Sequence, residues 1–181
     1  MRFWVGIVIP NKTYKKLFKL EKEISKKYKT YYSLNSKLGL HITITYQGNV
    51  DEKDLKEIEA IVKKISRNVR PFKINIMDVD VKKFNKNNVI YARVLKTRYL
   101  ENLKKMFSCG LKRFGIIRDT RSFTPHITLA CKDITKENFR RAFRELRHRK
   151  ISLEFKATKF YTGKAGPKER MRASKKFRLK V

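Results

Sequence analysis

The stretch Gly39-Leu40-His41-Ile42-Thr43-Ile44-Thr45-Tyr46-Gln47-Gly48 decides the fold prediction, because it has a counterpart in Pro125-His126-Ile127-Thr128-Leu129-Ala130. The chain holds three histidines, and two of them begin these His-Ile-Thr repeats, 85 residues apart. In both stretches apolar and polar residues alternate, which indicates a half-buried strand whose histidine and threonine point away from the core. The predicted polar face of the first strand carries His41, Thr43 and Thr45, and its apolar face carries Leu40, Ile42, Ile44 and Tyr46.

The repetition of this motif favours a catalytic role for the two histidines. A single histidine in a β-branched strand is usually an ordinary surface residue. Two imidazoles brought together, however, can act as general base and general acid near neutral pH. A threonine hydroxyl beside each imidazole can donate a hydrogen bond to a phosphate oxygen, where charge grows in the transition state. We therefore predict that His41 and His126 are catalytic and that Thr43 and Thr128 bind phosphate. This set suits hydrolysis of a phosphodiester without a metal or another cofactor.

The balance of charge is strongly basic. There are 47 Lys and Arg residues against 16 Asp and Glu, which gives a formal net charge of +31. This excess favours a polyanionic partner, nucleic acid rather than a membrane surface, with lysine-rich coding bias as the alternative explanation. A chain of 181 residues that is 41% hydrophobic has enough apolar material for one folded domain and argues against disorder.

The sequence contains no apolar run long enough for a membrane span, and its first residues lack the apolar core of a signal peptide. We therefore expect a cytoplasmic protein, acting as a monomer. Cys109 lies in a helical pattern and Cys131 on the apolar side of a strand. Neither has metal-ligand spacing, so we expect both to be buried free thiols.

The order of the predicted elements repeats along the chain. The first half has a strand at 2–9, a helix at 12–28, the first motif strand, a helix capped by Asp51 and a strand at 72–81 with a bulge near Ile76. The second has a strand at 89–95, a helix capped by Thr97 that ends near Gly115, the second motif strand, a helix capped by Thr135 and a long strand at 151–161. We infer an α+β tandem duplication, with halves at about 1–84 and 85–181 of one domain. Two such halves packed about a pseudo-twofold axis would place their motif strands across one cleft.

The chain from Gly163 onward is basic and ends in an expected edge strand at 177–181. Its cationic residues are Lys168, Arg170, Arg172, Lys175 and Lys176. Such a run is either solvated surface or a basic arm that contacts RNA over the cleft, and both interpretations stay open. The third histidine, His148, lies at a predicted helix end, where a cation suits the helix dipole, and we assign it no chemistry.

With these motifs the sequence resembles the 2H phosphoesterase superfamily, and within it the RNA 2′,3′-cyclic phosphodiesterases, historically called 2′-5′ RNA ligases. The resemblance covers nearly the whole chain. It is carried by the opening strand up to Pro10, by Leu40-His41-Ile42-Thr43 with Gly48-Asn49-Val50, by Pro71-Phe72, by Arg121-Ser122-Phe123-Thr124-Pro125-His126-Ile127-Thr128-Leu129-Ala130, and by Tyr161-Thr162-Gly163.

The resemblance implies a bilobed fold with antiparallel sheets flanking a central cleft, no metal, and catalysis by His41 and His126 with Thr43 and Thr128 on the phosphate. The implied reaction is hydrolysis of a 2′,3′-cyclic phosphate at an RNA 3′ end, such as that of a tRNA fragment, to a 2′-phosphomonoester. In reverse, the same chemistry would join that end to a 5′-hydroxyl as a 2′-5′ linkage. We favour His126 as the base and His41 as the acid.

This chain departs from the family after the second motif. Many relatives carry arginine directly after Thr-Leu-Ala, whereas this chain has Cys131-Lys132. Lys132 therefore joins Lys168, Arg170 and Arg172 as a candidate RNA contact. Two other functions stay open: a noncatalytic RNA-binding module, which leaves the repeated motifs unexplained, and a phosphodiesterase of 2′-5′ oligonucleotides or small cyclic nucleotides.

Overall fold

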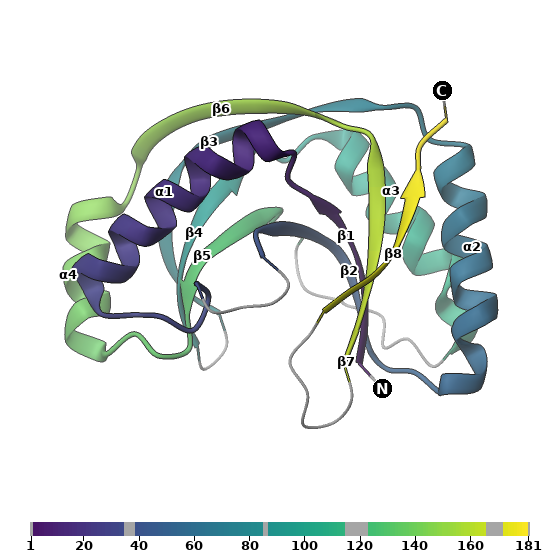
Figure 1. Cartoon of the computed structure of the whole chain (residues 1–181), viewed down its shortest axis with the longest axis horizontal. Coiled ribbons are helices and arrows are strands. Elements are labelled where there is room, and N and C mark those ends of the chain that lie inside the picture. Colours follow the sequence, from purple (N-terminus) through teal and green to yellow (C-terminus); the bar gives the residue numbers. More distant parts are fainter. Residues whose placement is uncertain (1, 35–38, 85–86, 115–122, 166–171, 181) are drawn as a thin grey trace.

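The computed structural model describes residues 2–34, 39–84, 87–114, 123–165 and 172–180. Within these ranges, four α-helices cover one eight-stranded sheet, which confirms the predicted α+β class (Figure 1). The strands are β1 (Arg2–Val8), β2 (His41–Asn49), β3 (Phe72–Phe84), β4 (Asn87–Val94), β5 (His126–Cys131), β6 (Arg149–Ala157), β7 (Lys159–Ala165) and β8 (Arg172–Arg178). The helices are α1 (Asn11–Tyr28), α2 (Leu55–Arg67), α3 (Arg98–Gly110) and α4 (Lys136–Leu146).

The strand order is β6-β3-β4-β5-β2-β1-β7-β8, and every pairing is antiparallel. The two motif strands, β5 and β2, lie side by side at the centre, each followed outward by three further strands. Figure 1 shows the sheet curving so that α1 and α4 lie together over one lobe and α2 and α3 over the other. The predicted antiparallel lobes are thus present, joined into one continuous sheet.

The two halves of the sequence exchange elements between these lobes. Helix α1 follows β1 along the chain but packs against β5, whereas α3 follows β4 and packs against β2. Strand β3 ends the first half, yet it pairs with β4 of the second. A lobe therefore does not correspond to a half of the sequence, and we propose that residues 1–181 fold as one unit.

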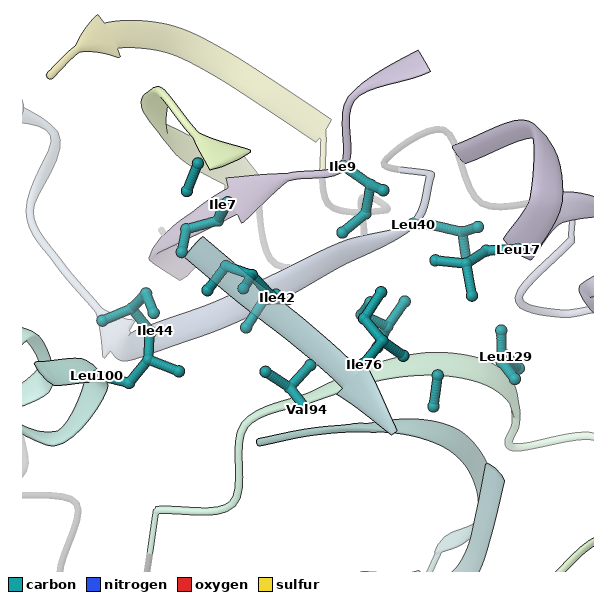
Figure 2. Close-up of a cluster of buried hydrophobic side chains, with 14 of the residues drawn as sticks. Ile7, Ile9, Leu17, Leu40, Ile42, Ile44, Ile76, Val94, Leu100 and Leu129 are labelled. Carbon is teal, nitrogen blue, oxygen red and sulfur yellow. The ribbon is translucent and has the colours of Figure 1, made fainter. Parts of the chain in front are cut away.

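The hydrophobic core lies between the sheet and the helices. Figure 2 shows side chains from both lobes meeting there, including Ile42 and Ile44 of β2 and Leu129 of β5. Ile42 and its partner Ile127 have no exposed surface. Because successive side chains of a strand point to opposite faces, their burial turns the motif histidines toward the other face of the sheet.

Several local predictions are confirmed and others are wrong. Thr97 and Thr135 cap α3 and α4 by accepting hydrogen bonds from Leu100 N and Asn138 N, and β3 shifts register after Ile76. Asp51 precedes a short 3-10 turn that leads into α2, and its side chain makes no cap hydrogen bond. The predicted strand at 151–161 is two strands, β6 and β7.

Three further predictions near these elements need correction. Helix α3 ends at Gly110, earlier than predicted, and is followed by a second 3-10 turn, while Gly115 lies outside the described residues. Cys109 is exposed and Cys131 is half-buried, so the expected burial of both thiols is wrong. The last strand, β8, begins at Arg172 instead of residue 177.

Candidate active site

The two motif strands meet at a single described backbone pair, Ile42 with Ile127. In an antiparallel ladder this register sets His41 opposite Thr128 and Thr43 opposite His126. All four side chains are half-buried on the face of the sheet opposite the core. Each imidazole therefore stands beside the threonine of the other motif, and the structure brings the four residues together.

Each motif strand carries the same irregularity directly after its threonine. Ile44 is left out of the pairing between β1 and β2, and Leu129 is left out of that between β4 and β5. These equivalent bulges add to the evidence for a duplication. The first bulge also corrects a prediction, because beyond it the alternation reverses: Thr45 is buried and Tyr46 is 40% exposed.

Matching hydrogen bonds fix the two imidazole rings. His41 Nδ1 lies 2.9 Å from the carbonyl oxygen of Gly39, and His126 Nδ1 lies 2.8 Å from that of Thr124. A carbonyl oxygen only accepts, so Nδ1 must carry the proton in both rings. In the neutral form of each ring Nε2 is then the basic nitrogen, which is the arrangement a proton-transfer pair requires.

An aromatic ring from the neighbouring strand lies against each histidine. The Trp4 and His41 ring centroids are 4.8 Å apart, and those of Tyr91 and His126 are 5.4 Å apart, edge to face. The Trp4 ring lies over Gly6 and Gly163, whose missing side chains leave room for it. A Cβ at Gly6 would lie 2.2 Å from the ring, and a Cβ at Gly163 would lie 1.6 Å from it. These contacts restrict both imidazoles to the orientation set by their Nδ1 hydrogen bonds.

An ion pair between the half-buried Arg93 and the buried Asp78 extends the site outward from His126. Arg93 stands opposite His126 in the β4–β5 ladder and opposite Asp78 in the β3–β4 ladder. Its guanidinium donates hydrogen bonds to both carboxylate oxygens of Asp78, which is 1% exposed in its side chain. In the next row of the sheet, the Tyr91 hydroxyl donates a 2.8 Å hydrogen bond to the Asp80 carboxylate. The face of this lobe that carries His126 thus also carries an ion pair and a tyrosine–aspartate hydrogen bond.

Burial changes the acidity of both histidines. It lowers the pKa of His41 and of His126 below 6.5, while the hydrogen bonds to the carbonyl oxygens of Gly39 and Thr124 act in the opposite direction. The positive charge of His126 further lowers the pKa of His41. The two rings therefore lie close enough to couple electrostatically, so that protonation of one opposes protonation of the other in the unliganded protein.

The predicted basic contacts are only partly described. Lys132 donates a 2.7 Å hydrogen bond to the Tyr32 hydroxyl and lies over that ring, so it braces the loop after α1. Asp133 holds the same loop by accepting from Thr30 Oγ1 and from the backbone of Tyr31 and Tyr32. Lys168 and Arg170 lie outside the described residues, and of Arg172 only the backbone in β8 is described.

Sequence reasoning did not identify Trp4, Tyr91, Arg93 or Asp78 as neighbours of the site. One signal was present: Tyr91 and Arg93 alternate with the apolar residues Ile90, Ala92 and Val94 in β4, as His126 and Thr128 alternate with apolar residues in β5. Their alignment with the motif depends on strand register, which the sequence pattern does not give. Within the described ranges, no three His, Cys, Asp or Glu side chains gather as a metal-binding group, and no helix is long and apolar enough to cross a membrane.

Comparison with known proteins agrees with this architecture. A family model described as the 2′-5′ RNA ligase superfamily matches residues 19–165. An RNA 2′,3′-cyclic phosphodiesterase of Bacillus subtilis (strain 168) is 25% identical over 138 residues, which is 76% of this chain and 74% of that protein.

Two solved structures are similar over nearly their whole length. TT0787 of Thermus thermophilus has a TM-score of 0.77 at 18% identity, and E. coli LigT complexed with 3′-AMP has a TM-score of 0.69 at 17% identity. Each alignment covers 99% of this chain and 98% of the other. At these identities the two structures show a shared fold.

Proposed function

The chain belongs to the 2′-5′ RNA ligase superfamily of 2H phosphoesterases, and from this we propose that it hydrolyses the 2′,3′-cyclic phosphate of an RNA 3′ end to a 2′-phosphomonoester. The observation that carries the proposal is the pair of imidazoles, each with Nδ1 on a backbone carbonyl and each beside the other motif's threonine. The curated relative from Bacillus subtilis bears the name of this activity, which supports the choice of substrate.

The proposed reaction needs one neutral and one protonated imidazole. The neutral ring takes a proton from water at Nε2, and the resulting hydroxide attacks phosphorus. The bond from phosphorus to the 3′ oxygen breaks as the other ring donates its proton to that oxygen. The products are a 2′-phosphomonoester and a 3′-hydroxyl, and the two histidines regain their starting states by exchanging protons with solvent.

Thr43 and Thr128 are proposed to stabilise the phosphate as it reacts. Their hydroxyls lie in the same two ladder rows as the imidazoles, so a phosphate between His41 and His126 also lies between the threonines. A donor that is already oriented toward the non-bridging oxygens needs no reorganisation as charge develops. The chain thus supplies proton transfer and charge stabilisation from four side chains on two adjacent strands.

Assignment of base and acid depends on how the substrate lies in the site. We favour His126 as base and His41 as acid, and the electrostatic coupling of the two rings opposes protonation of both at once without choosing between them. A substrate with sulfur in place of the 3′ oxygen separates the roles, because a thiolate leaves without protonation. That substrate should rescue the variant that lacks the acid and should not rescue the variant that lacks the base.

The direct test uses purified protein and a short RNA ending in a 2′,3′-cyclic phosphate, with and without a chelator. We expect a 2′-phosphomonoester in both reactions. A 3′-phosphomonoester would assign a different regiochemistry, and a folded protein without turnover would indicate a noncatalytic RNA-binding module. Adding a 5′-hydroxyl RNA tests the reverse 2′-5′ ligation, and size-exclusion chromatography tests the proposed monomer. We place this activity in the cytoplasm, where fractionation of cells can test it.

A further inference from the structure

A row of side chains leads from the active site to the edge of the sheet. Thr43 stands opposite Gly6, Gly6 opposite Tyr161, and Tyr161 opposite Lys176 on the edge strand β8. Directly opposed residues of antiparallel strands share a face, so Tyr161 and Lys176 lie on the same face as the site. Lys176 Nζ lies 5.7 Å from the centre of the Tyr161 ring, which confirms that the two side chains meet.

The row ends at a basic groove between β8 and α2, here called the edge groove. It has a volume of about 630 Å³ and is lined by Lys56, Glu59, Ala60, Lys63, Ser66, Arg67, Lys175, Lys176, Phe177 and Arg178. Of these ten residues six are cationic and one is anionic, and Glu59 is engaged by Lys175 at 2.8 Å. Lys175 and Phe177 face α2 whereas Lys176 faces the site, so the groove lies on the opposite face of the sheet from the row, and the two surfaces meet at Lys176 around the edge strand β8.

We propose that this surface binds single-stranded RNA upstream of the reacting 3′ end. On this proposal, which rests on the proposed function, the terminal nucleotide occupies the site. The preceding bases stack against Tyr161, and the phosphates then pass Lys176 and turn around the edge strand β8 into the edge groove. Aromatic rings that stack bases beside cations that track phosphates are the usual means of binding single strands without sequence preference.

The dimensions of the sheet set the length of RNA that this path requires. Three strand spacings of about 4.8 Å separate β2 from β8, or about 14 Å. At about 3.4 Å for each nucleotide of a stacked strand, the path to β8 takes about four nucleotides, and turning around this edge strand into the groove takes more. A mononucleotide or dinucleotide therefore cannot reach the edge groove, whereas a decamer can occupy it fully.

The test replaces three cations of the groove together: Lys56→Gln, Lys63→Gln and Arg178→Gln. The control, Lys12→Gln, Lys15→Gln and Lys16→Gln, removes the same charge from exposed positions on α1. Fluorescence anisotropy measures binding of a labelled decamer that ends in a 2′-phosphate, at low and at high salt. Thermal unfolding verifies that both variants are folded.

If all three cations contact phosphates, the magnitude of the slope of log K against log salt should fall by about 2. At about 0.1 M salt the affinity for the decamer should then fall by up to about 100-fold. The ratio of kcat/KM for the decamer to that for the mononucleotide should fall in the groove variant and stay at its wild-type value in the control. Equal effects of the two triple variants would overturn the proposal, because they would show that net charge alone acts. An unchanged salt slope in the groove variant would also overturn it.

A single substitution tests the row itself. Tyr161→Leu removes the ring while keeping an apolar side chain, and loss of one stacked base should weaken decamer binding about fivefold or more. Wild-type affinity in this variant would show that the RNA takes another route. Binding of the decamer needs no turnover, so the binding measurements test this proposal even if the protein does not hydrolyse a cyclic phosphate. Failure of the RNA-binding proposal can therefore be told apart from failure of the proposed function.

Discussion

Arg93 stands directly opposite His126, and both carboxylate oxygens of the buried Asp78 accept hydrogen bonds from its guanidinium. The position opposite His41 is Val8. The two histidines therefore have the same backbone setting but different neighbours. The ion pair makes the His126 side of the site the more polar of the two.

Replacing Arg93 should expose the dependence of the fold on this pair. In Arg93→Gln the carboxylate of Asp78 stays buried without its cation, and breaking a buried pair in this way is strongly destabilising. We expect a loss of about 3 kcal/mol in the free energy of unfolding, at the low end because Arg93 is 38% exposed. Urea denaturation measures this loss. Adding Asp78→Asn should recover part of it, and a double variant less stable than Arg93→Gln would contradict the explanation.

The paired histidines should each be needed for turnover. A positioned proton-transfer group contributes roughly 10²- to 10⁴-fold, so His41→Ala and His126→Ala should each lower kcat by about that factor. The double variant should be little worse than either single one, because the two residues act as a unit. His148→Ala is the matched control, since His148 is exposed beyond the end of α4. Full activity in either motif variant would exclude acid and base catalysis by this pair.

The threonines should matter through their hydroxyls and not through their shape. Thr43→Val and Thr128→Val keep the branched side chain and delete the donor, and losing one oriented donor costs roughly 2.7–4 kcal/mol of transition-state stabilisation. We expect the lower value, because each threonine has a counterpart in the other motif. Steady-state kinetics on a cyclic-phosphate RNA gives the measurement, with the exposed Thr158→Val as control. Wild-type kcat/KM in both variants would make them ordinary strand residues.

Local periodicity made much of this fold predictable. The helices capped by Thr97 and Thr135 and the register shift after Ile76 depend on residues close in sequence, and all three are observed. The repeated His-Ile-Thr motif likewise predicted two strands with matching faces. In these cases the sequence pattern and the tertiary contacts act in the same direction.

The remaining features depend on contacts between distant parts of the chain. A single unpaired residue, Ile44, reverses the alternation and exposes Tyr46, and no local signal marks it. Arg93 becomes a neighbour of His126 only through strand register. The sequence also does not determine which lobe α1 and α3 cover. Each helix has one apolar face, and that face could pack on either half of the sheet.

Glu21 provides a test of stability that is independent of the active site. It is 3% exposed in α1, and burial raises the pKa of its carboxyl from 4.5 to about 7. A raised carboxyl pKa means that the folded state holds the proton more tightly, so stability falls as pH rises from about 4.5 to 7 and is then constant. Glu21→Gln should therefore stabilise the protein by up to about 3 kcal/mol at about pH 8 and by little at about pH 4.5. Urea denaturation at both pH values decides this, and an equal effect at both would contradict the raised pKa.

The pH dependence of the reaction follows from the pKa values of the histidine pair. The reactive form has one neutral and one protonated imidazole, so kcat/KM falls at high pH as the acid loses its proton and at low pH as the base gains one. Because burial lowers the pKa of both rings, the centre of this bell should lie below pH 6.5. Its two limbs belong to the coupled pair and not to either residue alone.

Two further measurements make this prediction specific to the histidines. A bound phosphate favours the protonated ring, so the bell for kcat should lie at higher pH than the bell for kcat/KM. In ¹⁵N NMR of the unliganded protein, the two imidazoles should titrate in two separate steps below pH 6.5, because the charge on one ring opposes protonation of the other. Unfolding must be followed at each pH, since a lowered imidazole pKa also removes stability as pH falls below about 6.5. A kcat/KM bell centred above about pH 7, or loss of activity on adding a chelator, would rule out a reaction carried by this buried pair alone.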